Sequence, residues 1–414
     1  MKKDELPSVL RSLQNGKGRT SLAVAVGVLA MLLLLLSELL PGSRMQQILR
    51  RMNLEGPMKL IHCADLHLDS PMGTHMTMQQ ASARNTQITD SFLRLTDFAR
   101  ENGVRAVIIA GDLFDGTRVR SRTVDEILAA MERTPEVDYL YLPGNHDGAA
   151  RAFSDRVLPE NLKQFPTDWT TFCYENAAIS GVQLCADNGE TIYENVPHVP
   201  GCVNIAVLHG QAGTVSGENR VNLNALKGRG IDYLALGHIH SFTLQPLDEK
   251  GVYCYCGCLE GRGFDECGEK GFVLLDVDEK NVHPTFVPFA KCRLHRVTVD
   301  VTGLENNARI AQAMKQAVAE IPKEDMVEFL LTGKTDPGTD LSVPYLQELV
   351  KGKFAFTKVK DETAMALDPE QFQNDISLKG MFIRMVLSEV ENEEERAAII
   401  RTGLEALAGE EIGL

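Results

Sequence analysis

Five short apolar segments in this chain each end in side chains that can bind a metal ion or transfer a proton. Their length and apolar content predict buried β-strands. The segments are 59–63, 104–110, 137–142, 203–208 and 231–236. Apolar residues at helical spacing over 88–101, and a second helical segment over 123–133, separate the first three strands. Strands that alternate with helices in this way predict an α/β domain.

The polar residues at the strand ends are carboxylates, one amide and imidazoles. They are Asp65, His67, Asp112, Asn145, His146, His209, His238 and His240. Open α/β sheets bind ligands at the carboxyl ends of their strands, so we expect these side chains to meet at one edge. Oxygen and imidazole donors without thiolates suit Mn²⁺, Fe²⁺ or Zn²⁺. Eight such groups are too many for one ion and suit two ions that share a bridging carboxylate, as in phosphatases and nucleases.

The spacing within the clusters fits strand ends. In Asp65-x-His67 and His238-x-His240 the two polar residues are two positions apart. At an extended strand end such residues point the same way, while the residue between them faces the core. Glycines flank the clusters and permit tight turns and close backbone approach, because they lack a Cβ. They are Gly111, Gly144, Gly210 and Gly237.

Each residue taken alone has a plainer interpretation. A single aspartate after a strand, such as Asp112, is usually the N-cap of the next helix. Asp147 is expected to orient its neighbours or cap a turn, outside the metal shell. A single histidine is more often a satisfied core or surface group than a ligand. We therefore expect structural roles for His62, His75, His198, His283 and His295.

Charge and cysteine content limit the class of protein. The 414 residues carry a formal net charge of -15, which is unfavourable for a stand-alone nucleic-acid binder unless metal ions or a basic partner supply positive charge. Nine cysteines over so long a chain indicate reduced thiols. Cys254, Cys256 and Cys258 alternate and would share one face of a strand. Small packed residues are the favoured interpretation, and a zinc site with Cys267 is the alternative.

The N-terminal region contains one long apolar run. From Leu22 to Leu36 every residue is apolar or glycine, and Leu39 and Leu40 extend the run past Ser37 and Glu38. A membrane-spanning helix needs roughly 20 such residues, so 22–40 is expected to be a transmembrane anchor. The flanking basic residues are nearly balanced and do not set its orientation. No cleavage site of the A-x-A kind follows, which disfavours a signal peptide. The alternative is a foreign or misjoined extension before a domain that begins at Met58.

The pattern of predicted strands and helices changes after about residue 295. A strand over 295–301, a helix over 306–320 and a strand over 327–331 predict a small α+β unit. Asn392 is placed to cap a last helix, with Glu395 completing a capping box. Its apolar stripe favours an intramolecular core over a partner-binding face. The stripe and its stop are Ala397, Ile400, Leu404, Leu407 and Gly409. The expected domains are 1–57, 58–290 and 295–414.

Taken together, the motifs resemble the calcineurin-like metallophosphoesterase superfamily. They are Asp65-x-His67, Gly111-Asp112, Gly144-Asn145-His146-Asp147, His209 and Gly237-His238-x-His240. "GDLFD" at 111–115 is similar to the DNA-repair exonuclease branch, which includes the SbcD nuclease subunit. "ADLHLDSP" at 64–71 and "LEGRGFDECGEKGF" at 259–272 look most like YhaO-type members. The likeness covers about 58–414. Asp69, where SbcD-type members more often have glycine, favours the YhaO type.

The resemblance implies an α/β fold with a β-sandwich flanked by helices (αββα) and a C-terminal capping or partner-binding domain. It also implies roles for the site residues. Asp65, His67 and His240 would hold one metal ion, and Asn145, His209 and His238 the other. Asp112 would bridge the two ions, and His146 would be the catalytic group that protonates the leaving oxygen. Mn²⁺ is the implied metal.

The function expected from this resemblance is a two-metal phosphodiesterase, a DNA exonuclease that acts on DNA ends. Its implied partner is a coiled-coil ATPase of the SbcC or YhaN kind, and a homodimer is a further expectation. A phosphatase or small-nucleotide phosphodiesterase is the alternative, and a non-catalytic, membrane-tethered interaction protein is a third. The chemistry is expected in the cytoplasm, either free or at the inner face of the cell membrane.

Overall fold

A computed structural model of the protein describes residues 56–408, apart from 73–75, 117–118, 148–152, 154–155, 337–338, 340 and 366–371. The chain divides into two compact units, 1–57 and 58–414. The apolar segment 22–40, expected to span a membrane, lies outside the described residues. Among the helices that the structure does describe, none has the length and apolar character needed to cross a bilayer.

The first sheet has six strands and carries the N-terminal βαβ units. Its order is β14 (Val282–Pro288), β13 (Gly271–Val277), β1 (Met58–Cys63), β2 (Val104–Ala110), β3 (Asp138–Leu142) and β4 (Leu162–Gln164). The four strands β1 to β4 are parallel, and β13 joins β1 antiparallel. Helices α4 (Met78–Glu101) and α5 (Ser121–Glu132) connect β1 to β2 and β2 to β3. The alternation predicted from the sequence is confirmed.

The second sheet also has six strands. Its order is β11 (Thr243–Pro246), β12 (Val252–Tyr255), β10 (Tyr233–Gly237), β7 (Val203–His209), β6 (Ala177–Gly181) and β5 (Thr170–Cys173). The central strands β6, β7, β10 and β12 are parallel. A short helix α7 (Leu223–Leu226) and a small sheet of β8 (Gln211–Gly213) and β9 (Arg220–Asn222) lie between β7 and β10 in the sequence.

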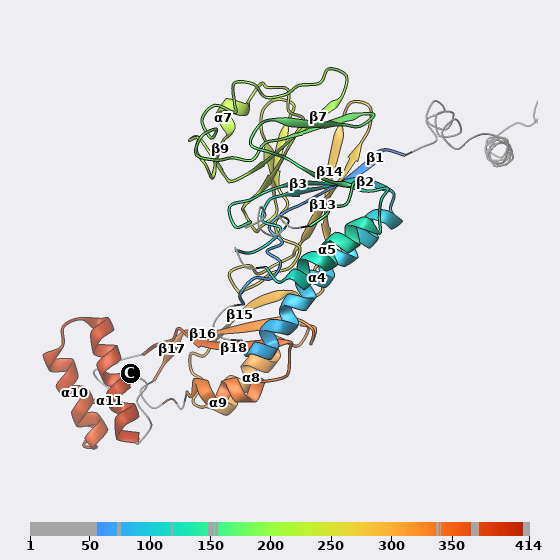
Figure 1. Ribbon diagram of the computed structural model, residues 1–414. Coiled ribbons are helices and arrows are strands. Elements are labelled where there is room, and N and C mark those ends of the chain that lie inside the picture. Colours follow the sequence, from blue (N-terminus) through green and yellow to red (C-terminus); the bar gives the residue numbers. More distant parts are fainter. Residues whose placement is uncertain are drawn as a thin grey trace, which may run out of the picture. The chain divides into compact units, whose positions relative to one another are not determined.

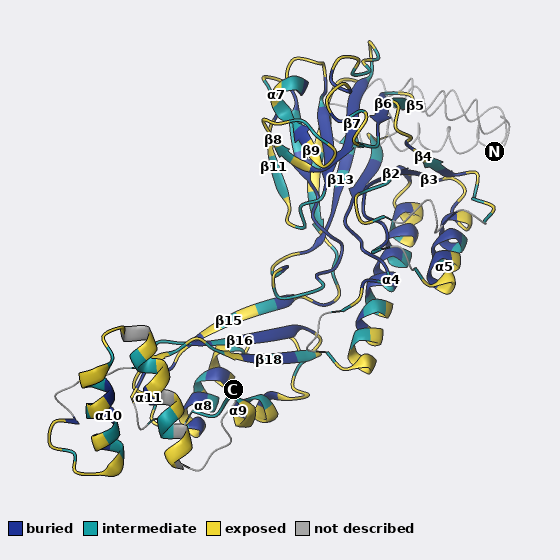
Figure 2. Ribbon diagram, turned by 60° about the vertical axis from the view of Figure 1, so that its left-hand side comes forward, coloured by how far each residue is buried: buried dark blue, intermediate teal, exposed yellow. Residues whose placement is uncertain are grey.

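The two sheets pack face to face. Leu60 and Ile108 of the first sheet share one buried cluster with Ile205 and Ala235 of the second. The outer face of the first sheet packs on α4 and α5, which lie side by side against it (Figure 1). The central strands of both sheets are buried, whereas the edge strands β5, β11 and β14 are partly exposed (Figure 2). A mixed α/β fold with sheets flanked by helices is therefore confirmed.

Helix α4 begins ten residues before the helical segment expected at 88–101. Its first turns are polar, so no apolar stripe announces them. Thr77 caps the helix: its side chain accepts a hydrogen bond from the Gln80 amide, and the Gln80 side chain accepts one from the Thr77 amide. This reciprocal capping stabilises a helix end that lacks buried contacts.

A three-stranded C-terminal sheet follows the two large sheets. It is formed by β15 (Leu294–Asp300), β16 (Met326–Thr332) and β18 (Phe356–Asp361), all parallel. Helices α8 (Asn307–Ala317) and α9 (Val343–Val350) alternate with these strands. The unit is therefore more regular than the α+β arrangement expected from the sequence. A pair of two-residue parallel strands continues from this sheet: β17 (Lys334–Thr335) follows β16, and β19 (Ala364–Met365) follows β18. The domain boundary expected at 290–295 stays a prediction.

Helices α10 (Leu378–Glu389) and α11 (Glu393–Ala408) form the last part of the described chain. The Asn392 side chain accepts a hydrogen bond from the Glu395 amide, so the predicted cap is confirmed. Ile400 is buried against α10, whereas Leu407 is 47% exposed. The intramolecular core is thus confirmed, but its stripe ends before Leu407. The predicted stop at Gly409 lies outside the described residues.

Candidate metal centre

The five polar clusters meet where the two sheets end. Asp65, Asp112 and Asn145 follow β1, β2 and β3 of the first sheet. His209 ends β7 and His238 follows β10 of the second sheet. The His238 amide donates hydrogen bonds of 2.9 and 3.0 Å to the two carboxylate oxygens of Asp65, which joins the sheets directly at this edge. The predicted convergence is confirmed.

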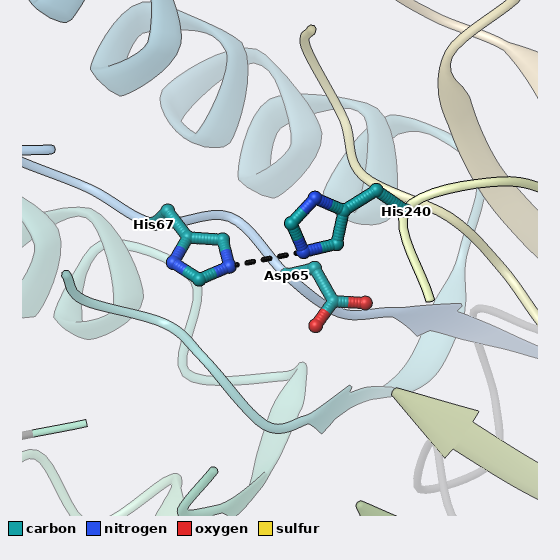
Figure 3. A group of neighbouring side chains, drawn as sticks. All are labelled: Asp65, His67 and His240. Atoms are coloured by element: carbon teal, nitrogen blue, oxygen red, sulfur yellow. Dashed lines mark hydrogen bonds between the residues drawn. The ribbon is translucent and has the colours of Figure 1, made fainter. Parts of the chain in front are cut away.

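Asp65, His67 and His240 form one group of ligand atoms, all within 4.8 Å of one another. Figure 3 shows the two rings facing each other beside the Asp65 carboxylate, with 3.2 Å between His67 Nε2 and His240 Nε2. Burial raises the pKa of Asp65 to about 6, although His209 and His240 oppose the shift. The three residues come from two sheets and from positions 173 residues apart.

Asn145, His209 and His238 form a second group. Asn145 Oδ1 lies 2.9 Å from His209 Nε2 and 3.3 Å from His238 Nδ1. His209 is 4% exposed, and its Nδ1 donates to the Ala110 carbonyl oxygen at 2.9 Å. The ring is therefore oriented by the backbone of the neighbouring sheet, with Nε2 facing the site.

Asp112 lies between the two groups. Its Oδ2 is 3.6 Å from His67 Nε2 and 3.4 Å from His209 Nε2. Its Oδ1 accepts a hydrogen bond of 2.8 Å from the His146 amide, which fixes the carboxylate. One oxygen thus faces a member of each group, as a bridging carboxylate requires.

The donor atoms of this site fit a cation. With Nδ1 donating to the backbone, neutral His209 would present an unprotonated Nε2 to oxygens of Asp112 and Asn145. A proton or a metal ion is needed to relieve the repulsion. Burial alone would lower the pKa of His209, but Asp112 outweighs it and raises the pKa to about 9. Oxygen and imidazole donors of this kind suit divalent transition metals. The ligand assignments themselves stay predictions.

The backbone at the strand ends is left-handed, not extended. Asp65 has φ 52°, His67 φ 46°, Asp112 φ 52° and His238 φ 106°. The expectation that both residues of each pair follow an extended strand is therefore wrong, although the side chains do reach the site. Non-glycine residues in this region cost about 1–3 kcal/mol each and persist where surrounding contacts enforce them. Here hydrogen bonds such as Asp65 N to Gly111 O, at 3.0 Å, link the strand ends.

The predicted need for glycines is confirmed at all four positions. A Cβ on Gly111 would lie 2.0 Å from His209 Nδ1, and one on Gly144 would lie 2.2 Å from Asp112 Oδ1. A Cβ on Gly237 would lie 1.9 Å from the Ala110 oxygen. Gly210 also confirms the expected close backbone approach, since its Cβ would lie 2.8 Å from the backbone carbon of Asn219, although not from a site residue.

His146 stands at the open side of the site. Its side chain is 51% exposed, and its ring centroid is 5.0 Å from that of His67. Asp115 Oδ1 lies 3.2 Å from His146 Nδ1. Asp115 accepts a hydrogen bond from Ser70 Oγ at 2.5 Å and is 3.2 Å from Arg262 Nη1. The nearby His67 side chain, more than any other group, holds the pKa of Asp115 well below its usual range.

Sequence reasoning did not assign three residues that surround the site: Asp115, Arg262 and Glu266. Glu266 Oε1 lies 2.6 Å from His240 Nδ1, and Arg262 Nη2 donates to the same oxygen at 3.0 Å. Their signal was present, because Asp115 ends the segment "GDLFD" and the others lie in "LEGRGFDECGEKGF". Asp115 lies five positions beyond the predicted strand 104–110, and the segment 259–272 follows no strand predicted from the sequence, so neither position is marked by a strand end.

Two aspartates near the site organise backbone. Asp147 accepts hydrogen bonds from the amides of Leu113, Phe114 and Gly144 at 2.7–3.2 Å. It therefore orients the turn, as expected, and burial raises its pKa to about 6. Asp69, the departure from the SbcD pattern, accepts a hydrogen bond of 2.6 Å from the Arg120 amide, just before α5. The Asp69 carboxylate therefore fixes the backbone at the N-cap residue of that helix.

All nine cysteines are free. Cys254 and Cys256 pack inside the sandwich, and burial raises the pKa of the Cys254 thiol to about 12. Within the part of the chain that the structure describes, no ligand group contains a cysteine. The packed interpretation is confirmed over the zinc alternative.

Residues 58–242 match the family model described as calcineurin-like phosphoesterase. This part of the chain is therefore a calcineurin-like phosphoesterase domain, and the resemblance found in the sequence is confirmed. All the proposed ligands, from Asp65 to His240, lie within this matched segment.

Similar proteins include some that are named for the repair of DNA double-strand breaks. The chain is 26% identical over 281 residues to the uncharacterized metallophosphoesterase YhaO of Bacillus subtilis, a match that covers 64% of this chain and 68% of YhaO. It is 28% identical over 255 residues to the DNA double-strand break repair protein Mre11 of Methanopyrus kandleri, covering 53% of this chain and 54% of Mre11. Mre11 of Saccharolobus solfataricus is 25% identical, with 49% and 58% covered. The chain thus spans little more than half of these Mre11 proteins.

Proposed function

We propose that this protein hydrolyses phosphodiester bonds of DNA with two divalent metal ions. One observation carries the two-ion proposal: Asp112 Oδ2 faces both His67, which groups with Asp65 and His240, and His209, which lies beside Asn145. A single ion needs one such group. Similarity to Mre11 proteins, which are named for repair of DNA double-strand breaks, supports DNA as the substrate.

The proposed ligands follow the two groups. Asp65, His67 and His240 would hold one ion, and Asn145, His209 and His238 the other, with Asp112 shared. When bound, the ions would supply positive charge to the phosphate and favour deprotonation of the attacking water. Asn145 contributes a neutral oxygen, which limits negative charge where an anionic substrate must enter. We propose Mn²⁺ as the metal, since hard oxygen and imidazole donors are mixed.

His146 is proposed as the general acid. Its exposed ring stands beside His67 and can reach a substrate that sits over the site. A proton at the ring would pass to the departing sugar oxygen as the phosphorus–oxygen bond breaks. Asp115, 3.2 Å from Nδ1, stabilises the protonated ring and leaves Nε2 to face the substrate.

We prefer DNA over small phosphate esters only because the chain is similar to Mre11 proteins. The formal net charge of -15 does not itself favour binding to nucleic acid. The two alternatives are a phosphatase and a small-nucleotide phosphodiesterase on the same site. A substrate panel separates them. The purified full chain with Mn²⁺ should degrade linear DNA from its ends and cleave a phosphodiester reporter. Faster turnover of a phosphomonoester than of DNA would overturn the choice of substrate.

Asp112→Asn is the control for the metal-dependent reaction. The amide keeps the size of the side chain and its contact with the His146 amide, but removes the charge shared by the two groups. Hydrolysis should fall by at least about 10²-fold. Equal activity in Asp112→Asn and the natural protein would contradict the two-ion proposal.

A coiled-coil ATPase of the SbcC or YhaN kind is proposed as partner. Support comes from α10, where Leu378, Met381 and Met385 recur at helical spacing and are each more than half exposed (Figure 2). Such a stripe suits an apolar face of a partner helix. Met381→Glu with Met385→Glu should abolish copurification of such a partner and leave nuclease activity of the isolated chain unchanged.

The chemistry is proposed to take place in the cytoplasm, because DNA must reach the site. Residues 58–414 should resist added protease in intact cells and become cleavable after lysis. Cleavage in intact cells would place the site away from DNA and favour a different phosphoester substrate.

A further inference from the structure

Residues 259–267 form a loop that follows β12 and leads into β13. We call it the carboxylate loop, because it carries two buried glutamates, Glu260 and Glu266, at 2% and 6% exposure. Buried carboxylates require partners, since unpaired charge is costly away from water. The two glutamates have separate partners, and only one of them faces the metal centre.

Glu266 is bonded to the loop on one side and to His240 on the other. Its Oε1 lies 2.6 Å from His240 Nδ1. Its Oε2 accepts a hydrogen bond of 2.7 Å from the Arg262 amide. A carboxylate accepts hydrogen bonds, so Nδ1 of His240 carries the proton and donates it. The other ring nitrogen, Nε2, is then unprotonated and faces His67 and the site.

Arg262 connects this contact to the proposed acid. Its Nη2 donates to Glu266 at 3.0 Å, and its Nη1 donates to Asp115 at 3.2 Å. Asp115 in turn faces His146. One guanidinium therefore links the carboxylate behind His240 with the carboxylate behind His146. Such contacts to a ligand's second nitrogen fix ring orientation and raise its basicity.

The C-terminal sheet supports the loop. Phe264 stacks on Phe356 of β18, with centroids 6.1 Å apart and planes inclined by 30°. Phe264 and Cys267 also pack against Leu294 of β15 and Met326 of β16. The loop is thus seated on one side against the C-terminal sheet and bonded on the other to the site.

We propose that Glu266 is a positioning residue: it holds His240 in the tautomer and orientation needed to ligate a metal ion, and the C-terminal sheet holds Glu266 in place through Phe264. This inference rests on the proposed two-metal function. It gives the C-terminal unit a direct role in the geometry of the site, beyond covering it or binding a partner.

The test compares Glu266→Gln with Glu260→Gln in the full chain. Glu260 is a matched control, because it is equally buried in the same loop but binds Arg84 and Ser91, away from the site. Calorimetric titration of the metal-free proteins with Mn²⁺ should show two ions in the natural protein. In Glu266→Gln one of them should bind 10–100-fold more weakly. Glu266→Asp should recover part of the affinity, and Glu260→Gln should bind as the natural protein does.

Nitrogen NMR of the histidine rings gives a second readout that needs no metal. The His240 signal, assigned by its loss in His240→Asn, should report a proton on Nδ1 in the natural protein. In Glu266→Gln the Nε2-protonated form should appear. Phe264→Ala should shift the same signal in the same direction, because its loss loosens the loop from the C-terminal sheet.

The outcomes separate the inference from the function on which it rests. If the natural protein binds no Mn²⁺ while Glu266→Gln changes the tautomer, the proposed function fails and the positioning contact stands. If Glu266→Gln keeps both the tautomer and the two Mn²⁺ affinities, the inference is overturned. It is also overturned if Glu260→Gln weakens Mn²⁺ binding as much as Glu266→Gln, since the effect would then be general loosening of the loop.

Discussion

His209 and His240 occupy the same site but are held in different ways. His209 ends a central strand, is 4% exposed, and donates to a backbone carbonyl of the opposite sheet. His240 lies in a loop, has a side chain that is 24% exposed, and donates to the side chain of Glu266. The first is fixed by the framework of the sandwich and the second by replaceable side chains. A substitution near His209, the strand-held side of the site, should therefore lower the stability of the fold. A substitution near His240, the loop-held side, should lower activity and leave stability unchanged.

The largest expected effect falls on the strand-held side. Gly237→Ala would place a Cβ 1.9 Å from the Ala110 oxygen, the same atom that orients His209. Neither strand can move without breaking its sheet, so the free energy of unfolding should fall by more than about 4 kcal/mol. Denaturant titration measures it. Gly213→Ala is the control, since its Cβ would meet nothing within 4 Å. If Gly237→Ala and Gly213→Ala had similar unfolding free energies, the strand-held side would not be the more rigid part of the site.

His146→Ala should cost function without stability. Its ring is 51% exposed, so folding should be unchanged, while kcat for DNA cleavage should fall about 10²–10⁴-fold with loss of the general acid. Mn²⁺ stoichiometry should stay at the natural value. His283→Ala, at an equally open position paired with Asp278, should change none of these. Cleavage by His146→Ala at the natural rate would rule out the acid role.

Metal removal tests whether the strand-held and loop-held ligands bind metal ions together, with Asp112 shared between them. Free Mn²⁺ at 100 times its dissociation constant should add about 2.7 kcal/mol to the unfolding free energy for each ion bound. Excess chelator should abolish the gain. In Asp112→Asn, which faces both groups, most of the gain should disappear. An equal gain in Asp112→Asn would place the ions elsewhere.

A smaller effect concerns acid stability of the framework. His62 lies in β1, bonds Tyr233 at 2.9 Å, and burial lowers its pKa to about 3. The unfolded chain takes up this proton near pH 6.5, so stability is lost as pH falls from 6.5 towards 3. The loss should reach about 2 kcal/mol at pH 5. The gap in unfolding free energy between the natural protein and His62→Gln should narrow by that amount between pH 7.5 and 5. A constant gap would contradict the assignment.

The same contrast explains what the sequence could predict. The residues at the ends of β1, β2, β3, β7 and β10 were found because strand periodicity and a polar end are local signals. The roles of Glu266 and Arg262 were not predicted, because they depend on partners far away in the sequence. Asp115, for example, is 147 residues from Arg262. The left-handed backbone at Asp65 and His67 was also not predicted, because φ there is enforced by hydrogen bonds between strand ends and not by residue type. Alternating strands and helices were predictable from residue patterns, whereas the packing of two sheets into a sandwich was expected only from the family resemblance.

The left-handed backbone at Asp65, His67, Asp112 and His238 has a consequence for anyone who redesigns this chain. Glycine or asparagine would adopt this backbone conformation with less strain, so a search for heat-resistant variants would select such replacements first. Each would remove a carboxylate or imidazole from the proposed centre. Thermostabilising libraries should therefore hold these four positions constant and seek their gains at the helices, where tolerance and chemistry do not conflict.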